Sequence, residues 1–286
     1  MVSILNAYVP FFVPIIIGYL LARFSSLNAV NVFPLVRFLF LPAVVFHSLS
    51  SSGRFNFTSF GYIALTGALM VIGGNLLMRG LKKVSKKDIN IEGSFPNVAY
   101  FTIPFFMVVL NSKGLQTACS FLLGASIAQI LVQPNKRYWE KVWREPWIIA
   151  AVIGIGVGLA NVRIPYLDLV FKPMYAAAAP LMLLYLGAFL HPFKGLKIAD
   201  LAASLSTRMI IGFAVALLAI NLLPISGAMA KSLMLLAIAP AGMMVFGPRN
   251  QWNVVSDKVG ILVVSILTTA ILISGWQPWT IKIPGL

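Results

Sequence analysis

The sequence predicts an all-α polytopic membrane protein of about ten transmembrane helices, and composition is the first reason. Hydrophobic residues make up 59% of the 286 residues and charged residues only 10%, with a mean hydropathy of +0.92. A soluble domain has about 45–50% apolar and about 25% charged residues. No soluble core can hide this much apolar surface, so lipid must be the solvent for most of the chain.

The second reason is the spacing of the apolar runs along the chain. A spanning helix needs roughly 20 apolar residues. Ten such helices with short loops use the whole length and leave no room for a soluble domain. The predicted helices, of which the sixth is the shortest, cover residues 4–22, 31–50, 59–79, 92–110, 115–133, 147–161, 168–190, 199–223, 227–247 and 256–276.

The basic residues predict the orientation of these helices. The formal net charge is +15, but lysines and arginines lie in short gaps between apolar runs, which argues against nucleic acid as a partner. Fourteen of them follow odd-numbered runs and six follow even-numbered runs. By the positive-inside rule both termini lie on the non-cytoplasmic side, and we expect a bacterial inner membrane. Residues 1–22 lack the features of a cleaved signal peptide and are expected to remain as the first helix.

Two prolines divide the chain into similar halves. Pro96 in the fourth run and Pro240 in the ninth are 144 residues apart, almost half the chain. Five helices per half is an odd number, so the second half must enter the membrane from the opposite side, as in the inverted repeats of many secondary transporters. We expect a first five-helix repeat at 1–133, a cytoplasmic linker at 134–146 and a second repeat at 147–286.

The fourth run carries Asn97 between Pro96 and Pro104. A proline inside a helix removes an N–H donor and clashes with an earlier carbonyl. In hydrocarbon the freed backbone groups are tolerated only where they face protein or a wet cavity. This pattern predicts a discontinuous helix whose half-helix N-terminus points at a negative group. The alternative is a simple kink, with the Asn97 side chain hydrogen-bonded to a neighbouring helix.

The ninth run contains the second predicted break, at Pro240. Gly242 follows it and allows a close approach of backbone, and the methionines after Gly242 offer adaptable apolar contact. Taken alone, this stretch is compatible with ordinary packing. Breaks at equivalent points of both halves favour a binding site between them.

Several short motifs together resemble the auxin efflux carrier family, which includes the plant PIN-type auxin exporters. They span essentially the whole chain, and only the set is specific. The motifs are Pro96-Asn97 with Pro104, Pro240-x-Gly242-x-x-x-Phe246 with Asn250-Gln251-Trp252-Asn253-Val254 and Asp257, Pro42-x-x-x-Phe46-His47-x-x-Ser50, and Glu145-Pro146-Trp147 through Gly187-Ala188-Phe189-Leu190.

The resemblance implies an NhaA/bile-acid-transporter-like fold, in which the fourth and ninth helices cross at their prolines in mid-membrane. It further implies a scaffold bundle, a transport bundle that moves like an elevator, and a homodimer. In this family the asparagine after the crossing proline contacts the substrate carboxylate. Carried over residue by residue, the substrate-binding residues are Asn97, Pro96, Pro240, Gly242 and Met243.

The chain also departs from the family pattern. Bacterial members usually have a Thr-Gly pair where this chain has Val98 and Ala99, and often an asparagine where it has Phe38. The long cytoplasmic loop of the plant exporters is absent. These departures concern the substrate more than the fold.

The placement of acidic residues bears on the driving force. All seven lie in loops or at the ends of predicted helices. Ion-coupled transporters commonly keep a carboxylate in mid-membrane, so its absence argues against obligatory cation coupling. A monovalent anion leaving a cell that is negative inside gains about 2.3 kcal/mol per 100 mV, enough for roughly 50-fold accumulation outside. We therefore expect potential-assisted export of a small organic monocarboxylate.

Two other functions remain open. Uptake of a dicarboxylate such as malonate would be favoured by an additional cationic group in the cavity. A membrane receptor or scaffold that transports nothing is the second alternative. An enzyme is the least favoured class, because no Ser-His-Asp, metal-ligand or paired-carboxylate set is present, and we expect neither cofactor nor metal. The single cysteine, Cys119, excludes a disulfide within the chain.

The remaining polar and glycine positions have simpler interpretations. Arg37 and Arg208 lie near the ends of predicted helices and are expected to snorkel towards water. Histidine side chains in general can change charge near neutral pH, but the sequence offers no evident acidic partner for His47 or His191, so proton coupling is a minor alternative. The glycines at 154–158 sit in an apolar run and predict close helix packing rather than a nucleotide loop.

Overall fold

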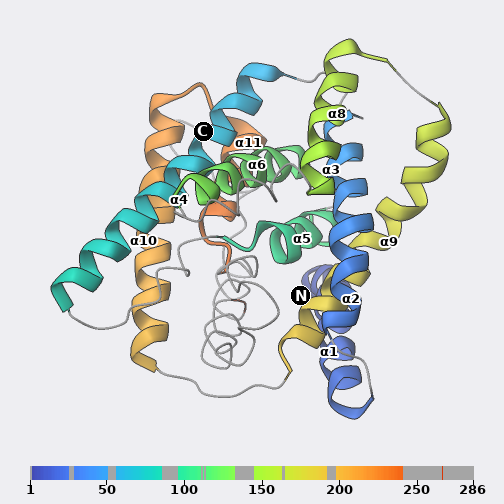
Figure 1. The fold of residues 1–286 in the computed structure, drawn as a ribbon, viewed down its shortest axis with the longest axis horizontal. Helices are drawn as coiled ribbons and strands as arrows, with labels where there is room; N and C mark the ends of the chain where they lie inside the picture. Colours follow the sequence, from blue (N-terminus) through green and yellow to red (C-terminus); the bar gives the residue numbers. More distant parts are fainter. Residues whose placement is uncertain are drawn as a thin grey trace.

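The computed structural model describes residues 2–25, 29–50, 56–85, 96–110, 112, 114–132, 145–162, 165–191, 198–240 and 266 (Figure 1). Nearly all of them are helical. The elements, with η marking π-helical turns, are α1 (Val2–Phe24), α2 (Ala29–Leu35), η1 (Val36–Phe40), α3 (Leu41–Ser50), α4 (Phe57–Ser85), η3 (Val98–Thr102), α5 (Ile103–Val108), α6 (Leu115–Val132), α8 (Pro146–Ala160), α9 (Pro165–Phe189), α10 (Ile198–Leu222) and α11 (Gly227–Ala237).

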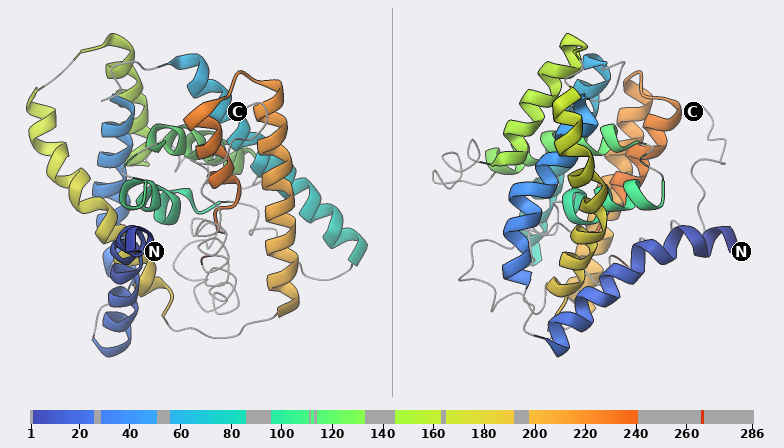
Figure 2. Two further views of the ribbon diagram at one scale, coloured as in Figure 1. Left: turned by 180° about the vertical axis from the view of Figure 1, so that it is seen from behind. Right: turned by 90° about the vertical axis from the view of Figure 1, so that its right-hand side faces the viewer.

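The helices form two groups that meet along a short central segment (Figures 1 and 2). In the first group α1 packs along α9, α8 packs along α3, and α3 contacts α9. In the second group α4 packs along α6 and α10, and α11 packs on both α10 and α6. The segment η3–α5 lies between them, in contact with α9 on one side and α6 on the other.

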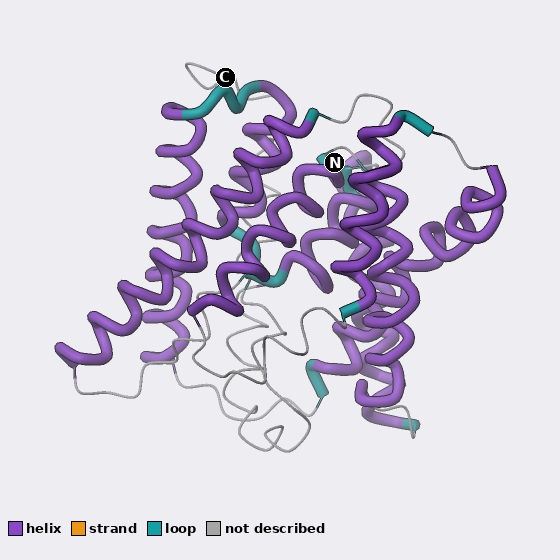
Figure 3. Tube along the Cα trace, turned by 45° about the horizontal axis from the view of Figure 1, so that its top comes forward, coloured by secondary structure: helices purple, strands orange, loops and turns teal. Residues whose placement is uncertain are grey.

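Four described helices are long and apolar enough to cross a membrane, judged by length and composition: Asn31–Ser50, Phe57–Leu77, Leu115–Val132 and Leu169–Phe189. Shorter apolar helices cover five more of the predicted runs, and the described residues contain no strand (Figure 3). The protein is thus all-α with the apolar helices of a membrane protein. The count of ten and the inverted repeat stay predictions, because the tenth run and most of the linker lie outside the described residues.

The outward faces of the helices are apolar, as a lipid surround requires. Large aliphatic side chains that would be unfavourable against water stand exposed along α1, α4, α8 and α10. Examples are Ile16, Leu20, Leu69, Leu76, Val152, Ile153, Ile210, Leu218 and Leu222. This exposure extends along whole helices rather than forming one isolated patch.

Several buried hydroxyl and amide groups in the helices bond to the backbone of their own helix. The Thr66 hydroxyl donates to the carbonyl of Tyr62 at 2.8 Å, and the Asn75 amide donates to the carbonyl of Val71 at 2.9 Å. The Ser120 hydroxyl donates to the carbonyl four residues earlier. Such bonds to the carbonyl four residues earlier satisfy a polar side chain without any water or partner helix. They allow these helices to carry polar residues inside hydrocarbon.

Glycines bring backbones into direct contact within each group. A Cβ atom on Gly18 of α1 would overlap the carbonyl of Leu184 in α9, and one on Gly187 of α9 would overlap the carbonyl of Ile15 in α1. The second group has an equivalent reciprocal pair where α4 crosses α6. Small residues at such crossings permit close van der Waals packing in membranes. Of the glycines at 154–158, Gly154 in α8 bears out the predicted helix packing, since its Cβ would lie 3.1 Å from the carbonyl oxygen of Phe46, whereas Gly156 does not, since nothing lies within 4 Å of a Cβ there.

Two prolines are each preceded by a π-helical turn. Pro42 is the second residue of α3 and follows η1, and Pro104 is the second residue of α5 and follows η3. In both places the residue just before the proline donates its N–H to the carbonyl five residues earlier. A proline cannot donate to the chain and crowds the carbonyl four residues back, and the wider turn accommodates both effects. Pro104 therefore does not break the helix, whereas Pro96 lies outside it.

We expect Gly187→Ala to destabilise the protein through the α1–α9 contact. The added methyl meets backbone that must shift, and overpacking of this kind costs about 1–3 kcal/mol. Gly156→Ala is a matched control, because nothing lies within 4 Å of a Cβ at that position. Thermal unfolding of the purified protein in detergent measures both variants. An unfolding temperature for Gly187→Ala equal to that of the control would contradict the crossing.

Candidate functional site

The two stretches in which helix breaks are predicted meet in space. The N–H of Asn97 donates a hydrogen bond to the carbonyl oxygen of Pro240 at 2.7 Å, and Pro96 is buried beside them. Helix η3 begins only at Val98, and α11 ends at Ala237, three residues before Pro240. Two non-helical stretches from distant parts of the chain therefore satisfy each other's backbone. Among the predicted site residues, Pro96, Asn97 and Pro240 come together, while Gly242 and Met243 lie outside the described residues.

Asn97 uses most of its hydrogen-bonding groups to start the helix. Its side-chain oxygen accepts from the N–H of Tyr100 at 3.1 Å, which caps the first turn. Its carbonyl accepts from both the N–H and the hydroxyl of Thr102, at 3.1 and 3.0 Å. Only the side-chain nitrogen Nδ2 has no partner, although Asn97 is 2% exposed. A buried donor without an acceptor is costly, and it marks a place where a ligand oxygen would be stabilised.

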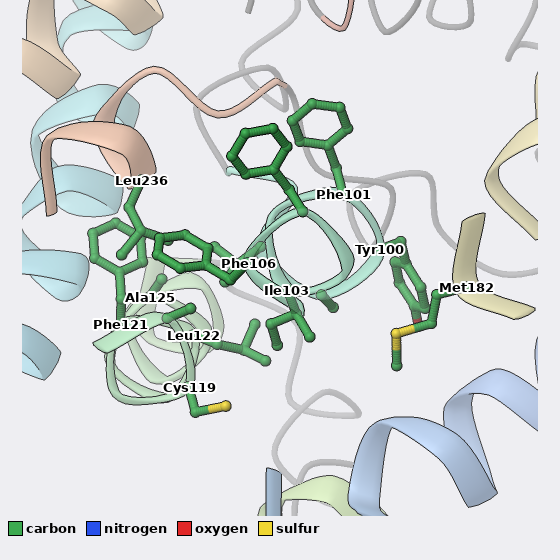
Figure 4. Close-up of a cluster of buried hydrophobic side chains, with 14 of the residues drawn as sticks. Tyr100, Phe101, Ile103, Phe106, Cys119, Phe121, Leu122, Ala125, Met182 and Leu236 are labelled. Atoms are coloured by element: carbon green, nitrogen blue, oxygen red, sulfur yellow. The ribbon is translucent and has the colours of Figure 1, made fainter. Parts of the chain in front are cut away.

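Aromatic rings surround the first turn after Asn97. The ring of Tyr100 lies 5.3 Å from that of Tyr185 and 6.1 Å from that of Phe33, measured between centroids. Figure 4 shows Tyr100 beside Met182 of α9. The Tyr100 hydroxyl is buried and, like the Asn97 amide nitrogen, has no partner. The turn thus combines two unpaired polar groups with apolar and aromatic neighbours, which is the usual make-up of a small-molecule site.

The opposite side of this turn is packed by phenylalanines. Phe11 of α1 makes edge-to-face contacts with Phe101 and Phe105, each at 5.4 Å between centroids. Phe106 faces Phe121 of α6 and Leu236 of α11 (Figure 4). Edge-to-face pairs of this kind add about 0.5–1.5 kcal/mol each beyond the area they bury. They hold the helix that begins at Asn97 in one orientation.

Arg37 corrects one prediction. It was expected to snorkel near a helix end, but its guanidinium forms a two-point ion pair with Glu145, with Nε to Oε2 at 2.9 Å and a second contact from Nη2 to Oε1. Arg37 sits in the η1 turn, in the interior of the continuous helix α2–η1–α3. Glu145 immediately precedes α8. The physical reason is that a carboxylate at the start of a neighbouring helix offers the planar fork a better partner than distant water.

The two histidines lie against tyrosines. The His47 ring is 4.5 Å from the ring of Tyr175, whose hydroxyl is 2.6 Å from the hydroxyl of Ser112. The His191 ring meets that of Tyr19 edge to face at 5.5 Å. These ring contacts do not test the minor alternative of proton coupling. The Arg208 side chain lies outside the described residues.

Sequence reasoning did not single out Tyr100, Tyr185 or Glu145 as residues near the site. Tyr100 follows Asn97 by about one helical turn, and that spacing could have indicated that the two side chains lie near each other. Tyr185 and Glu145 reach the region from other helices, and no local pattern connects them to it. Within the described residues, no group of three or more His, Cys, Asp or Glu side chains is arranged to hold a metal ion.

Comparison with known proteins does not assign the chain. No protein-family model matches it, and no curated protein matches it by sequence. The arrangement around Asn97 therefore has to be interpreted from its own geometry.

Replacing Asn97 should separate its capping role from its free nitrogen. Asn97→Ala removes the oxygen that caps the Tyr100 N–H and should lower stability by about 1 kcal/mol. Asn97→Ser retains a hydroxyl oxygen able to cap and should cost much less. Thermal unfolding of both variants in detergent provides the measurement. Equal losses for the two substitutions would mean that the cap does not contribute.

Proposed function

We propose that this protein is a secondary transporter that exports a small organic monocarboxylate of auxin-like chemistry by elevator-type alternating access. The observation that carries the proposal is the unpaired Nδ2 of Asn97, buried where two non-helical stretches of the chain meet. An amide nitrogen is a hydrogen-bond donor, so the group that would satisfy it is an acceptor such as a carboxylate oxygen. The site would therefore bind an anion rather than a cation.

The start of helix η3 adds to this preference. Unsatisfied N–H groups and the helix dipole give a helix N-terminus a partial positive charge. Discontinuous helices in transporters direct such ends at anionic substrate groups near the bilayer midplane. The carboxylate would accept from the Asn97 amide, and the apolar body of the substrate would lie against the rings of Tyr100 and Phe33. The Tyr100 hydroxyl could then find a partner on the substrate.

The packing of the helices supports a movement of one group against the other. The pairs α1–α9 and α3–α8 match what inverted repeats require, since each joins the first helix of one predicted repeat to the second helix of the other. In the proposed mechanism the group α1–α3, α8 and α9 is the scaffold. The group α4, α6, α10 and α11 carries η3–α5 and the substrate across, which exposes Asn97 to each side of a bacterial inner membrane in turn.

The resemblance to the auxin efflux carrier family agrees with this proposal, and membership of that family is part of what we propose. Arg37 is an observation in favour of the alternative, dicarboxylate transport, because it supplies a cation close to the site. Its ion pair with Glu145 neutralises that charge, so the monocarboxylate remains the preferred substrate. A receptor or scaffold is the outcome indicated if no carboxylate binds or moves.

The binding part of the proposal predicts that Asn97→Ser loses affinity while it keeps the fold. Loss of a hydrogen bond to a charged group costs about 1.5–3 kcal/mol, or roughly tenfold to a hundredfold in Kd. Binding is measured by thermal shift with indole-3-acetate, benzoate and butyrate, since a ligand that binds only the folded state raises the unfolding temperature. Thr117→Ser, on another helix, serves as a control. If wild type and Asn97→Ser bind these anions equally, the site is wrong.

The driving force predicts a dependence on voltage. In inside-out vesicles, a potassium diffusion potential of 100 mV that is positive in the vesicle lumen should drive accumulation of a labelled monocarboxylate up to roughly 50-fold. Collapsing the potential with an ionophore should abolish accumulation but leave exchange intact. Accumulation that follows a proton or sodium gradient at zero potential would contradict the proposed coupling.

A further inference from the structure

The ion pair between Arg37 and Glu145 stands close to the candidate site. The Arg37 guanidinium lies 5.4 Å above the ring of Phe33, one helical turn earlier on the same helix. The Phe33 ring in turn lies 6.1 Å from the Tyr100 ring, and Tyr100 belongs to the first turn after Asn97. An unbroken series of contacts therefore connects the guanidinium to the two unpaired polar groups.

The pair is sheltered, and both of its partners are held. The Arg37 and Glu145 side chains are 32% and 15% exposed, so solvent screens them less than surface charges. The π-helical turn η1 fixes the backbone of Arg37, and Glu145 is fixed by the start of α8. Two parallel contacts occupy one edge of the guanidinium. Three of the five N–H donors stay open, so what the pair changes is the charge that arginine presents to another carboxylate, which Glu145 largely cancels.

We infer that the Arg37–Glu145 pair determines the charge of the anion that the site accepts, with Glu145 as the residue that excludes dicarboxylates. This inference rests on the proposed function. A monocarboxylate needs one set of donors, which the Asn97 amide nitrogen and the Tyr100 hydroxyl supply. A dicarboxylate brings a second negative charge, which would approach Arg37 and find its charge cancelled by Glu145. Beside this neutral pair the second carboxylate gains no net attraction that offsets the cost of leaving water.

The location fits a selective role at the cytoplasmic entrance. The predicted orientation places the linker before Glu145 and the loop before α2 on the cytoplasmic side. An anion to be exported approaches from there and would pass the pair before it reaches Asn97. A neutral pair at the entrance leaves a second negative charge unstabilised and does not weaken the contacts of a monocarboxylate with Asn97.

The test is a change of selectivity in Glu145→Gln, which keeps the shape of the side chain but frees the guanidinium. Binding of malonate and succinate is compared with binding of indole-3-acetate and butyrate by thermal shift and by competition in vesicles. The ratio of dicarboxylate to monocarboxylate affinity should rise by about tenfold or more, the effect of one hydrogen bond to a charged group. In the double variant Arg37→Gln with Glu145→Gln, this gain should vanish.

The possible outcomes distinguish a failure of this inference from a failure of the proposed transport function. Wild type that binds neither class of anion overturns both. Wild type that binds monocarboxylates, with a folded Glu145→Gln of unchanged ratio, overturns the inference alone. If Glu145→Gln does not fold, the exchanged pair Arg37→Glu with Glu145→Arg retains an ion pair and brings the negative charge next to Phe33. That variant should bind monocarboxylates about tenfold more weakly, and unchanged binding would overturn the inference.

Discussion

The rest of the structure depends on the hydrogen bond from the Asn97 N–H to the Pro240 carbonyl, because this bond pairs two backbone groups that lie outside any helix. In hydrocarbon every backbone polar group needs a partner inside the protein. Here two non-helical stretches lie against each other, and one supplies the acceptor that the other lacks. Their meeting also explains why a polar side chain such as Asn97 is buried between apolar helices.

The packing within each group of helices differs from the packing between the groups. Within a group, glycines such as Gly18 and Gly187 bring backbone against backbone, and a contact of that kind fixes both helices. Between the groups, the contact near the site is made by rings, as between Tyr100 and Tyr185. Each group is thus held internally by backbone contacts, and near the site the two groups are joined by side chains.

Sequence reasoning reached the helices because lipid imposes one strong requirement, namely about twenty apolar residues per span. It placed a helix boundary near Pro96 for an equally local reason, since proline lacks the donor that a helix needs, and helix η3 begins at Val98. It misjudged Arg37, because position near the end of a run does not reveal which neighbouring helix offers a carboxylate. Sequence reasoning also could not predict the aromatic rings around Tyr100. Rings from helices far apart in the chain, such as Phe33 and Tyr185, come together only through the tertiary packing.

The two π-helical turns affect which changes in chain length the protein can tolerate. Such a turn contains one residue more than the α-helical turn it replaces, so the helix beyond it is rotated by about 100° relative to an uninterrupted one. The extra residue in η1 allows Arg37 to reach Glu145 while the buried side of α3 packs along α8. Loss of one residue there would rotate α3 and turn its buried face away from α8. It would also leave Pro42 in an ordinary α-helical turn, where its ring crowds the carbonyl four residues back, so one deletion would disturb both the packing of α3 and the helix around Pro42.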